Sequence, residues 1–275
     1  MRQRKVRNLD EKLNRVDLYY IRDARQMRGH WLEAFGDVNG RTPADPAQEL
    51  LLTGRPARPQ EPPLYLELGC GKGNFLLAHA AADPGGRYVG IEGQESVALR
   101  ALEKLMDEPC RDCSGGKLEN VRLAAEFVND LDDYFEQEEL RGIYLNFSDP
   151  WPKDRHAKRR LTHRNKLLRY EKVLKPGGFV EIKTDNDALF GFTLAEIAAC
   201  GLRIKACSRD LHGPERFLML AGGGASFECA ESAEGNDQGG GARGAILRAA
   251  EFRTEYEEKF HLAGKSINFI RLEKV

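Results

Sequence analysis

The chain has 275 residues, of which 41% are hydrophobic and 31% charged, and its formal net charge is −1. This balance is typical of a soluble globular protein. No run of about 18 apolar residues occurs and the N-terminus lacks an apolar signal core, so neither a membrane helix nor a secretory signal is expected. Six irregularly spaced cysteines indicate reduced thiols in a cytoplasmic protein.

The N-terminal region differs in composition from the rest of the chain. Residues 1–35 are basic and amphipathic, which favours an arm with helical potential. Residues 36–63 are rich in proline and have no clear period, which is typical of an irregular linker. We therefore expect a basic arm and Pro-rich linker over residues 1–63 and one domain over residues 64–275.

From residue 64 onward, short apolar runs alternate with longer segments of helical period. This alternation predicts an α/β fold, with a mostly parallel sheet and helices on both faces. Such sheets bind ligands outside the carboxyl ends of their strands. The predicted strands are Leu64–Leu68, Arg87–Ile91, Val121–Ala124, Ile143–Phe147, Phe179–Lys183, Leu202–Cys207 and Ile267–Leu272. The predicted helices are Asn74–Ala82, Gln94–Met106, Asn129–Glu138, Thr162–Val173 and Asp187–Cys200.

Residues 222–245 interrupt this pattern before the last predicted strand. They hold eight glycines and almost no large apolar side chains. Because such a segment cannot bury enough surface to offset the entropy of ordering the chain, we expect a mobile Gly-rich inserted loop.

The first predicted strand runs directly into three alternate glycines, Gly69, Gly71 and Gly73. Glycine permits positive φ and a close backbone approach to a ligand, and the following helix offers free N–H groups. A dinucleotide site has its third glycine one place later, and no G-x-x-x-x-G-K-[ST] motif for a nucleoside triphosphate occurs. The acid that precedes the turn, Glu67, instead suits a positively charged ligand such as S-adenosylmethionine.

A second acid, Glu92, ends the next predicted strand. An acid at this place can accept both ribose hydroxyls of a nucleoside. Taken alone, each feature also fits a tight β–α turn with solvated acids. The combination favours an S-adenosylmethionine site that binds the cofactor through Glu67, Gly69, Gly71, Gly73 and Glu92.

A proline-rich turn follows the fourth predicted strand and carries Asp149, which we expect at the ligand-binding edge beside the sulfonium. Trp151, between two prolines, fits either a core anchor or a wall beside a flipped base. From Lys153 to Lys175, ten Lys or Arg residues stand against two acids. Such a run is usually a solvated helix face, but beside the active edge it indicates a track for a phosphate backbone.

These segments together resemble the bacterial tRNA (guanine-N7)-methyltransferase family. The resemblance rests on LELGCGKGNF, YVGIE, NFSDPWPKDRHAKRRLTHR, KPGGFVEIKTDN, TEYEEKF and GKSINFIRLE. Among these, Asp-Pro-Trp-Pro-Lys is specific to the family, whereas the glycine turn is shared by many methyltransferases. The resemblance implies a seven-stranded, Rossmann-like class I S-adenosylmethionine-dependent methyltransferase sheet. It also implies methyl transfer to N7 of a guanine in the variable loop of tRNA.

The resemblance further implies the roles of individual side chains. Asp149 matches the position assigned both to the cofactor and to catalysis. The place of the family's adenine contact falls on Phe127, so we expect that contact from the backbone there or from Asn129. The family's substrate-binding positions match Lys153, Asp185, Thr254, Glu255, Tyr256 and Glu257. The Gly-rich insertion is a departure from the family's spacing, and it either alters tRNA docking or is tolerated as a surface loop.

The chemistry at guanine N7 needs little proton transfer, because this atom has an in-plane lone pair and no proton. The enzyme must align N7 with the methyl carbon and the sulfur. Methylation leaves positive charge on the purine, so we expect Asp149 to stabilise that charge and to accept from N1–H and the amino group. Asp185 can share this role.

Several other interpretations remain open from the sequence. Cys110 and Cys113 form half of a zinc motif, but no second pair has suitable spacing, and we expect no metal. A methyltransferase of the same fold that acts on a protein or small molecule is one rival, and an RNA-binding protein without catalysis is another. We expect no membrane partner, and both a monomer and a homodimer are compatible with the sequence.

Overall fold

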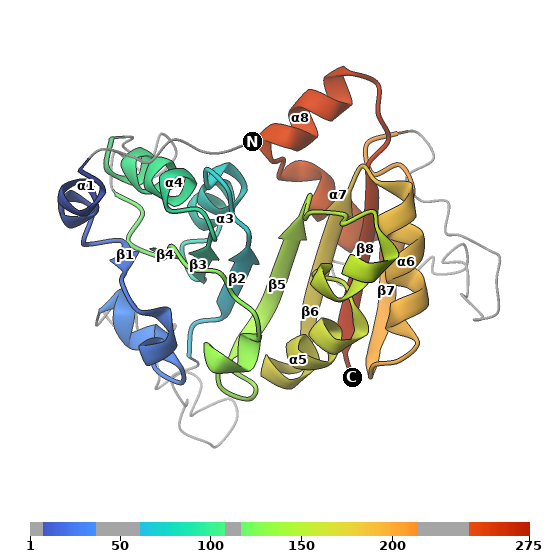
Figure 1. Ribbon diagram of the computed structural model, residues 1–275, viewed down its shortest axis with the longest axis horizontal. Helices are drawn as coiled ribbons and strands as arrows, with labels where there is room; N and C mark the ends of the chain where they lie inside the picture. Colours follow the sequence, from blue (N-terminus) through green and yellow to red (C-terminus); the bar gives the residue numbers. More distant parts are fainter. Residues whose placement is uncertain (1–7, 37–60, 108–116, 214–241) are drawn as a thin grey trace, which may run out of the picture.

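The computed structural model describes residues 8–36, 61–107, 117–213 and 242–275, and it forms one twisted sheet with helices on both faces (Figure 1). The eight strands follow the order β1-β4-β3-β2-β5-β6-β8-β7. All neighbouring pairs are parallel except those of β8, which runs antiparallel to both β6 and β7. The strands are β1 (Tyr20–Ile21), β2 (Leu64–Leu68), β3 (Arg87–Ile91), β4 (Val121–Ala124), β5 (Leu140–Asn146), β6 (Leu174–Thr184), β7 (Leu202–Ser208) and β8 (Asn268–Lys274).

The helices that connect the parallel strands cover the two faces of the sheet. The α-helices are α1 (Leu9–Arg15), α3 (Asn74–Ala82), α4 (Glu95–Asp107), α5 (Arg164–Val173), α6 (Asp187–Ile197), α7 (Ala242–Glu251) and α8 (Glu255–Leu262). Short 3-10 helices form at η1 (Ala24–Met27), η2 (Trp31–Phe35), η3 (Leu131–Asp133) and η4 (Asp154–Arg159). No helix within the described ranges combines the length and the apolar composition needed to cross a membrane.

Alternating side chains of the strands separate the core into two sides. Leu64, Leu66 and Leu68 of β2 pack with side chains of α5 and α6 on one face. Tyr65 points to the other face, where it packs with residues of α3 and β3. Burial on both faces explains why these strands have continuous apolar runs, as expected for parallel strands between helical layers.

The N-terminal residues pack directly on the sheet. β1 pairs in parallel with β4 and adds an eighth strand at the edge. Trp31 is fully buried, its ring stacks on Phe135 at 5.2 Å, and its indole N–H donates to the carbonyl oxygen of Tyr134 at 2.9 Å. Residues 8–36 therefore share the core of the sheet. The predicted linker lies mainly at residues 37–60, outside the described residues, and the division at residue 63 stays a prediction.

The predicted α/β fold with a mostly parallel sheet is confirmed, and β2 to β8 form at the seven predicted strand segments. The strand count differs by one, because a two-residue strand such as β1 has no period of its own. The helix predicted over Asn129–Glu138 is wrong, since only η3 forms there. Asp132 faces Lys172 of α5 at 3.3 Å and Glu138 has a φ of 59°, so tertiary contacts and a left-handed residue replace the helix.

Candidate active site

A pocket of about 620 Å³ opens at the carboxyl ends of β2, β3 and β5. In the sheet, β2 has β3 as its neighbour on one side and β5 on the other. The strand order therefore reverses at β2, and ligands of such sheets bind at this switch point. Its volume is within the usual range for small-molecule sites. The lining residues are Glu67, Gly69, Cys70, Gly71, Lys72, Asn74, Phe75, Glu92, Gln94, Ser96, Val97, Arg100, Asn146, Phe147, Thr254, Glu255 and Tyr256.

The glycine turn between β2 and α3 forms one wall with its backbone. Gly69, Gly71 and Gly73 have φ values of 79°, 56° and 77°, a region that favours glycine. A Cβ atom on Gly69 or Gly71 would have no neighbour within 4 Å, so this backbone is open to a ligand. A Cβ on Gly73 would come within 3.0 Å of Ala101, so this glycine serves the packing of α3 on α4 and does not line the pocket.

Glu67 lies at the floor of the pocket with its carboxylate only partly satisfied. It is 2% exposed and accepts a hydrogen bond from Nδ2 of Asn146 at 2.8 Å. Its second oxygen, Oε2, and Oδ1 of Asn146 are buried without a donor among the described residues. Burial raises the pKa of Glu67 to about 8, against the opposing effects of Asn146, Lys183 and the backbone N–H of Leu76. Two buried acceptor oxygens without donors fit a ligand that brings N–H groups and positive charge.

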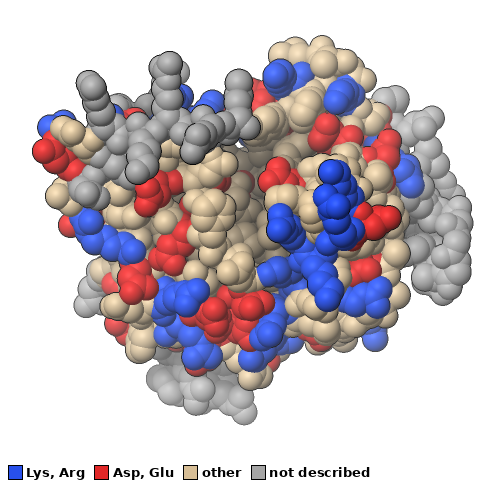
Figure 2. Space-filling model, viewed as in Figure 1, with Lys and Arg blue, Asp and Glu red and all other residues tan. Residues whose placement is uncertain are grey.

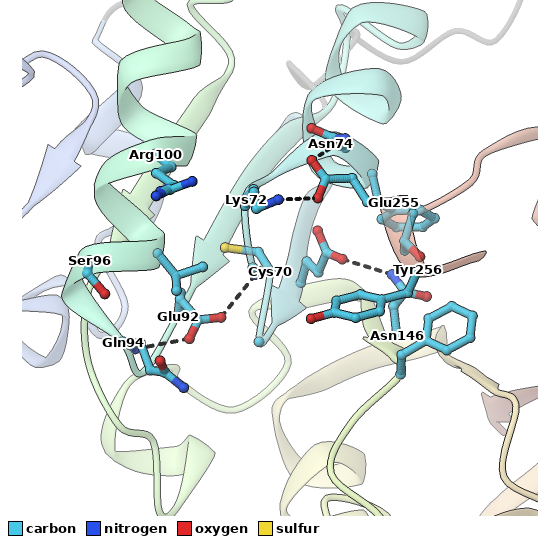
Figure 3. Close-up of a pocket in the computed structure, with 17 residues that line it drawn as sticks. Cys70, Lys72, Asn74, Glu92, Gln94, Ser96, Arg100, Asn146, Glu255 and Tyr256 are labelled. Carbon is cyan, nitrogen blue, oxygen red and sulfur yellow. Dashed lines mark hydrogen bonds and ion pairs between the residues drawn. The ribbon is translucent and has the colours of Figure 1, made fainter. Parts of the chain in front are cut away.

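Glu92 connects the glycine turn with the start of α4. One carboxylate oxygen accepts from the backbone N–H of Gly71 at 3.0 Å, and the other accepts from that of Gln94 at 2.9 Å (Figure 3). Each oxygen keeps a further lone pair for a ligand. Glu92 therefore holds two pocket segments in place while its carboxylate still faces the pocket.

The structure leaves the two residues predicted to hold adenine outside the pocket lining. Phe127 is 75% exposed, and its ring covers Gly93, where a Cβ atom would come within 2.4 Å of the ring. Asn129 is exposed two residues further on. Phe127 thus borders the Glu92 side of the site as an apolar side chain rather than as a hydrogen-bonding group.

The turn after β5 is held in an unusual backbone conformation. Phe147 and Trp151 have φ values of 50° and 42°, which L-residues rarely adopt. The guanidinium of Arg160 donates to the carbonyl oxygens of Pro150 and Trp151 at 3.0 Å. Asp149 is exposed within this turn and does not line the pocket, although Phe147 does.

Helix α8 supplies the opposite wall. Thr254 begins it with a capping box, in which its hydroxyl accepts from the N–H of Glu257 and the Glu257 carboxylate accepts from the N–H of Thr254. Glu255 accepts from Lys72 at 2.6 Å and from Asn74 at 3.0 Å, so α8 is tied to the glycine turn across the pocket (Figure 3). Tyr256 extends into the pocket and is 62% exposed.

Three other predicted substrate contacts lie elsewhere. Glu257 is fully buried beneath α8 and bound to Lys183, so its carboxylate does not reach the pocket. Asp185 faces Lys265 at 3.4 Å, and Lys153 is exposed before η4. The structure therefore gathers seven of the predicted residues at one pocket: Glu67, Gly69, Gly71, Glu92, Thr254, Glu255 and Tyr256.

Sequence reasoning missed several pocket residues. Asn146 ends β5 and Phe147 follows it, so their place at the carboxyl edge of the sheet marks them as pocket candidates. Ser96 and Arg100 of α4 reach the pocket only because of how that helix packs, and no motif marks them. Cys110 and Cys113 lie outside the described residues, so the expectation of no metal stays a prediction.

Basic side chains gather on the face that carries the hollow of the pocket, over α5 and the turn before it (Figure 2). Those on α5 are largely paired with acids: Arg164 with Glu196 at 2.8 Å, and Lys172 with Asp132 at 3.3 Å. Those at η4 are exposed, with Arg159 over the ring of Trp151 at 5.0 Å. The available positive charge is therefore concentrated at η4, next to the turn that carries Asp149.

Comparison with known proteins agrees with this geometry. Residues 61–213, more than half of the chain, match the sequence model of a putative methyltransferase family. A tRNA (guanine-N(7)-)-methyltransferase of Lachnoclostridium phytofermentans is 34% identical over 268 residues, which cover 98% of this chain and 96% of the relative. One from a Geobacillus species is 34% identical over 257 residues, covering 94% and 88%.

Solved structures give a more distant comparison. The structure of an antibiotic-related methyltransferase has a TM-score of 0.49 and 16% identity, and the match covers 85% of this chain and 95% of that one. The sequence comparisons are decisive, since they extend over nearly the whole length of both proteins. The chain belongs to the tRNA (guanine-N(7)-)-methyltransferase family.

Proposed function

We propose that this protein transfers a methyl group from S-adenosylmethionine to N7 of a guanine in the variable loop of tRNA. The observation that carries the proposal is the near full-length match to tRNA (guanine-N(7)-)-methyltransferases, joined to a pocket at the switch point of the sheet. A methyltransferase that acts on a small molecule would not need the basic side chains at η4, which flank the turn after β5.

The pocket residues fit the cofactor by their chemistry. The open oxygens of Glu67 and Asn146 suit the ammonium of the methionine part, and Glu92 suits the ribose hydroxyls. The backbone of Gly69 and Gly71 permits close approach. When bound, the cofactor supplies a methyl carbon activated by a positively charged sulfur.

The protein's own contribution is alignment and charge stabilisation. Guanine N7 needs no general base, so the reaction depends on how the base is oriented toward the pocket. Asp149 is our candidate for the acceptor of the guanine N1–H and amino protons, and for the carboxylate that stabilises the positive purine. Asp185, which follows β6, is assigned to share this role.

An aromatic pair at the pocket is suited to the base itself. The rings of Phe147 and Tyr256 lie with their centroids 6.5 Å apart at 31°, and both side chains line the pocket. Flipped bases are commonly stacked on aromatic side chains. We assign Tyr256, with Phe147, to that contact and Thr254 to the rim beside it.

The charged surface at η4 is suited to the tRNA backbone. Lys153, Lys158 and Arg159 are exposed there and can approach phosphates. Arg160 differs, because it is 9% exposed and its guanidinium holds the Pro150 and Trp151 carbonyls. We therefore assign Arg160 to the turn and its neighbours to the phosphates.

The remaining parts of the proposal concern the setting. We place the protein in the cytoplasm, where its tRNA substrate is found, with no metal in the reaction. We keep both a monomer and a homodimer open, and size-exclusion chromatography with light scattering distinguishes them.

The function is tested by incubating the protein with radiolabelled cofactor and two tRNA transcripts. One transcript carries guanine and the other carries 7-deazaguanine, which has carbon in place of N7. We expect label in the first and none in the second, with chemical cleavage at a variable-loop guanine. Equal labelling of both transcripts would contradict N7 as the target, and binding of tRNA without labelling would favour the non-catalytic rival.

A further inference from the structure

Lys183 of β6 is a fully buried lysine that does not line the pocket. Its ammonium has three N–H bonds and three acceptor groups. It donates to the carbonyl oxygens of Ala249 and Phe252, each at 2.6 Å, and to the carboxylate of Glu257 at 3.0 Å. Every donor of this buried cation is therefore satisfied, which is the condition for keeping such a charge in a protein core.

The three acceptors belong to one corner of the chain. Ala249 is in the last turn of α7 and Phe252 follows it, so Lys183 satisfies carbonyl groups that a helix end leaves open. Glu257 is the third residue of α8 and part of its capping box. Lys183 thus joins the end of one helix to the start of the next.

His212 completes the contact from the other side. Its Nε2 lies 2.6 Å from Oε1 of Glu257, its side chain is 4% exposed, and it follows β7. Burial by itself would raise the pKa of Glu257, but the His212 hydrogen bond and the Lys183 charge outweigh it and keep the pKa below its usual value. An ionised Glu257 between two donors locks the first turn of α8 to β6 and β7.

The same corner forms a wall of the pocket. The segment from Thr254 to Tyr256, between Phe252 and Glu257, lines the pocket over its whole length. Phe252 also packs on His79 of α3, with ring centroids 3.9 Å apart. Within the described ranges, the ion pairs that join α8 to the sheet and to the loop after β7 are those of Glu257 with Lys183 and His212.

We propose that Lys183 is a positioning residue, whose buried ammonium fixes the corner between α7 and α8 and thereby places the α8 wall of the pocket. Glu257 is its partner in this role rather than a substrate contact. The inference rests on the proposed function, because the wall it places is the one assigned to the tRNA base. Lys183 itself does not line the pocket, although its charge also lowers the pKa of Glu67 there.

The test removes the buried pair without leaving one charge unpaired. The double variant Lys183→Met/Glu257→Gln keeps side-chain volume and a capping residue at the start of α8. The matched control is Lys205→Met/Glu273→Gln, the same pair of residue types at 3.6 Å on β7 and β8, far more exposed. Melting temperature, S-adenosylhomocysteine binding, kcat and KM for tRNA, and amide hydrogen exchange are compared for both.

A positioning role predicts a rise in KM for tRNA of about tenfold with kcat within about threefold, because the residues at the ends of β2 and β5 keep their geometry. Exchange is expected to increase in residues 249–262 and not in the sheet. The control is expected to match the wild type in both. The single variant His212→Asn should give a smaller rise in KM and in hydrogen exchange. It provides the test if the double variant folds poorly, because it leaves no cation unpaired.

Two results would overturn the proposal. In the first, the double variant loses kcat while its KM for tRNA stays at the wild-type value. That result would mean that fewer molecules are folded, and not that the α8 wall of the pocket is displaced. The other is unchanged exchange over residues 249–262. Hydrogen exchange requires no tRNA, so the two proposals can fail separately. A wild-type enzyme that fails to methylate tRNA would refute the proposed function, whereas the exchange result would still test the role of Lys183.

Discussion

Two buried glutamates flank the pocket, and their surroundings are opposite. Glu67 of β2 has one hydrogen bond and one open oxygen, and burial raises its pKa to about 8. Glu257 of α8 is enclosed by Lys183, His212 and its own capping box, and its pKa is lowered. Burial alone therefore does not mark a binding acid. The acid that still lacks a donor is the one suited to a ligand.

A third acid, Asp149, is exposed, and replacing it should have the largest effect. Asp149→Ala removes the carboxylate assigned to the positive purine, so we expect kcat to fall by about 100-fold or more. Single-turnover kinetics with saturating tRNA measure the loss. S-adenosylhomocysteine affinity within a few-fold of the wild type would separate this effect from loss of the cofactor site. Near-normal turnover would contradict the electrostatic role of Asp149.

Neutralising the acid with the open oxygen should weaken the cofactor rather than the fold. A hydrogen bond to a charged group contributes about 1.5–3 kcal/mol, so Glu67→Gln should weaken S-adenosylhomocysteine binding roughly 10- to 100-fold. Calorimetry measures the change, with Glu273→Gln as a control acid on β8. Because the neutral glutamine places no charge in this buried position, the melting temperature of Glu67→Gln should not fall. A destabilised variant with intact affinity would reverse our distinction between the two glutamates.

The same contrast between free and paired groups applies to the basic segment. Lys153→Gln/Lys158→Gln removes exposed charge at η4, and we expect tRNA binding to weaken roughly tenfold and its salt dependence to flatten by about two phosphate contacts. The control Lys166→Gln/Lys172→Gln has the same net charge, but its lysines face Asp130 and Asp132. If the salt dependence of tRNA binding changed only in the control variant, the tRNA backbone would contact α5 rather than η4.

The smallest expected effect concerns Glu255, whose carboxylate is 38% exposed and paired with Lys72. Exposed ion pairs contribute little, so Glu255→Gln should speed release of S-adenosylhomocysteine only by a factor of about two to five. Stopped-flow displacement measures the rate. Loss of tRNA binding with an unchanged release rate would instead support a direct substrate contact for Glu255.

Whether each feature can be predicted from the sequence depends on how far apart its residues lie along the chain. The glycine turn, β2 and α3 follow from neighbouring residues, and their predicted bounds match the structure. The network around Lys183 joins residues 74 positions apart, so the local Thr-x-x-Glu pattern of the capping box does not reveal that Glu257 pairs with Lys183. The edge strand β1 escaped prediction because its pairing with β4 defines it.

The open oxygen of Glu67 also has a consequence for pH dependence. Its pKa in the folded protein, about 8, lies above the ordinary value of 4.5, so the folded state binds the proton more tightly. This contribution to stability is complete below pH 4.5 and is lost as the pH rises through about 8. Ligand-free Glu67→Gln should therefore show a flatter dependence of melting temperature on pH across this window.

The most direct test of the contrast between the two glutamates is proton release on cofactor-site binding. At pH 7 the ligand-free Glu67 is mostly protonated, and a cationic ammonium beside it favours the carboxylate. Titration with S-adenosylhomocysteine in two buffers of different ionisation enthalpy should therefore show release of about one proton in the wild type and close to none in Glu67→Gln. Equal proton release in the two proteins would contradict the assignment of Glu67 as the acid that receives the cofactor.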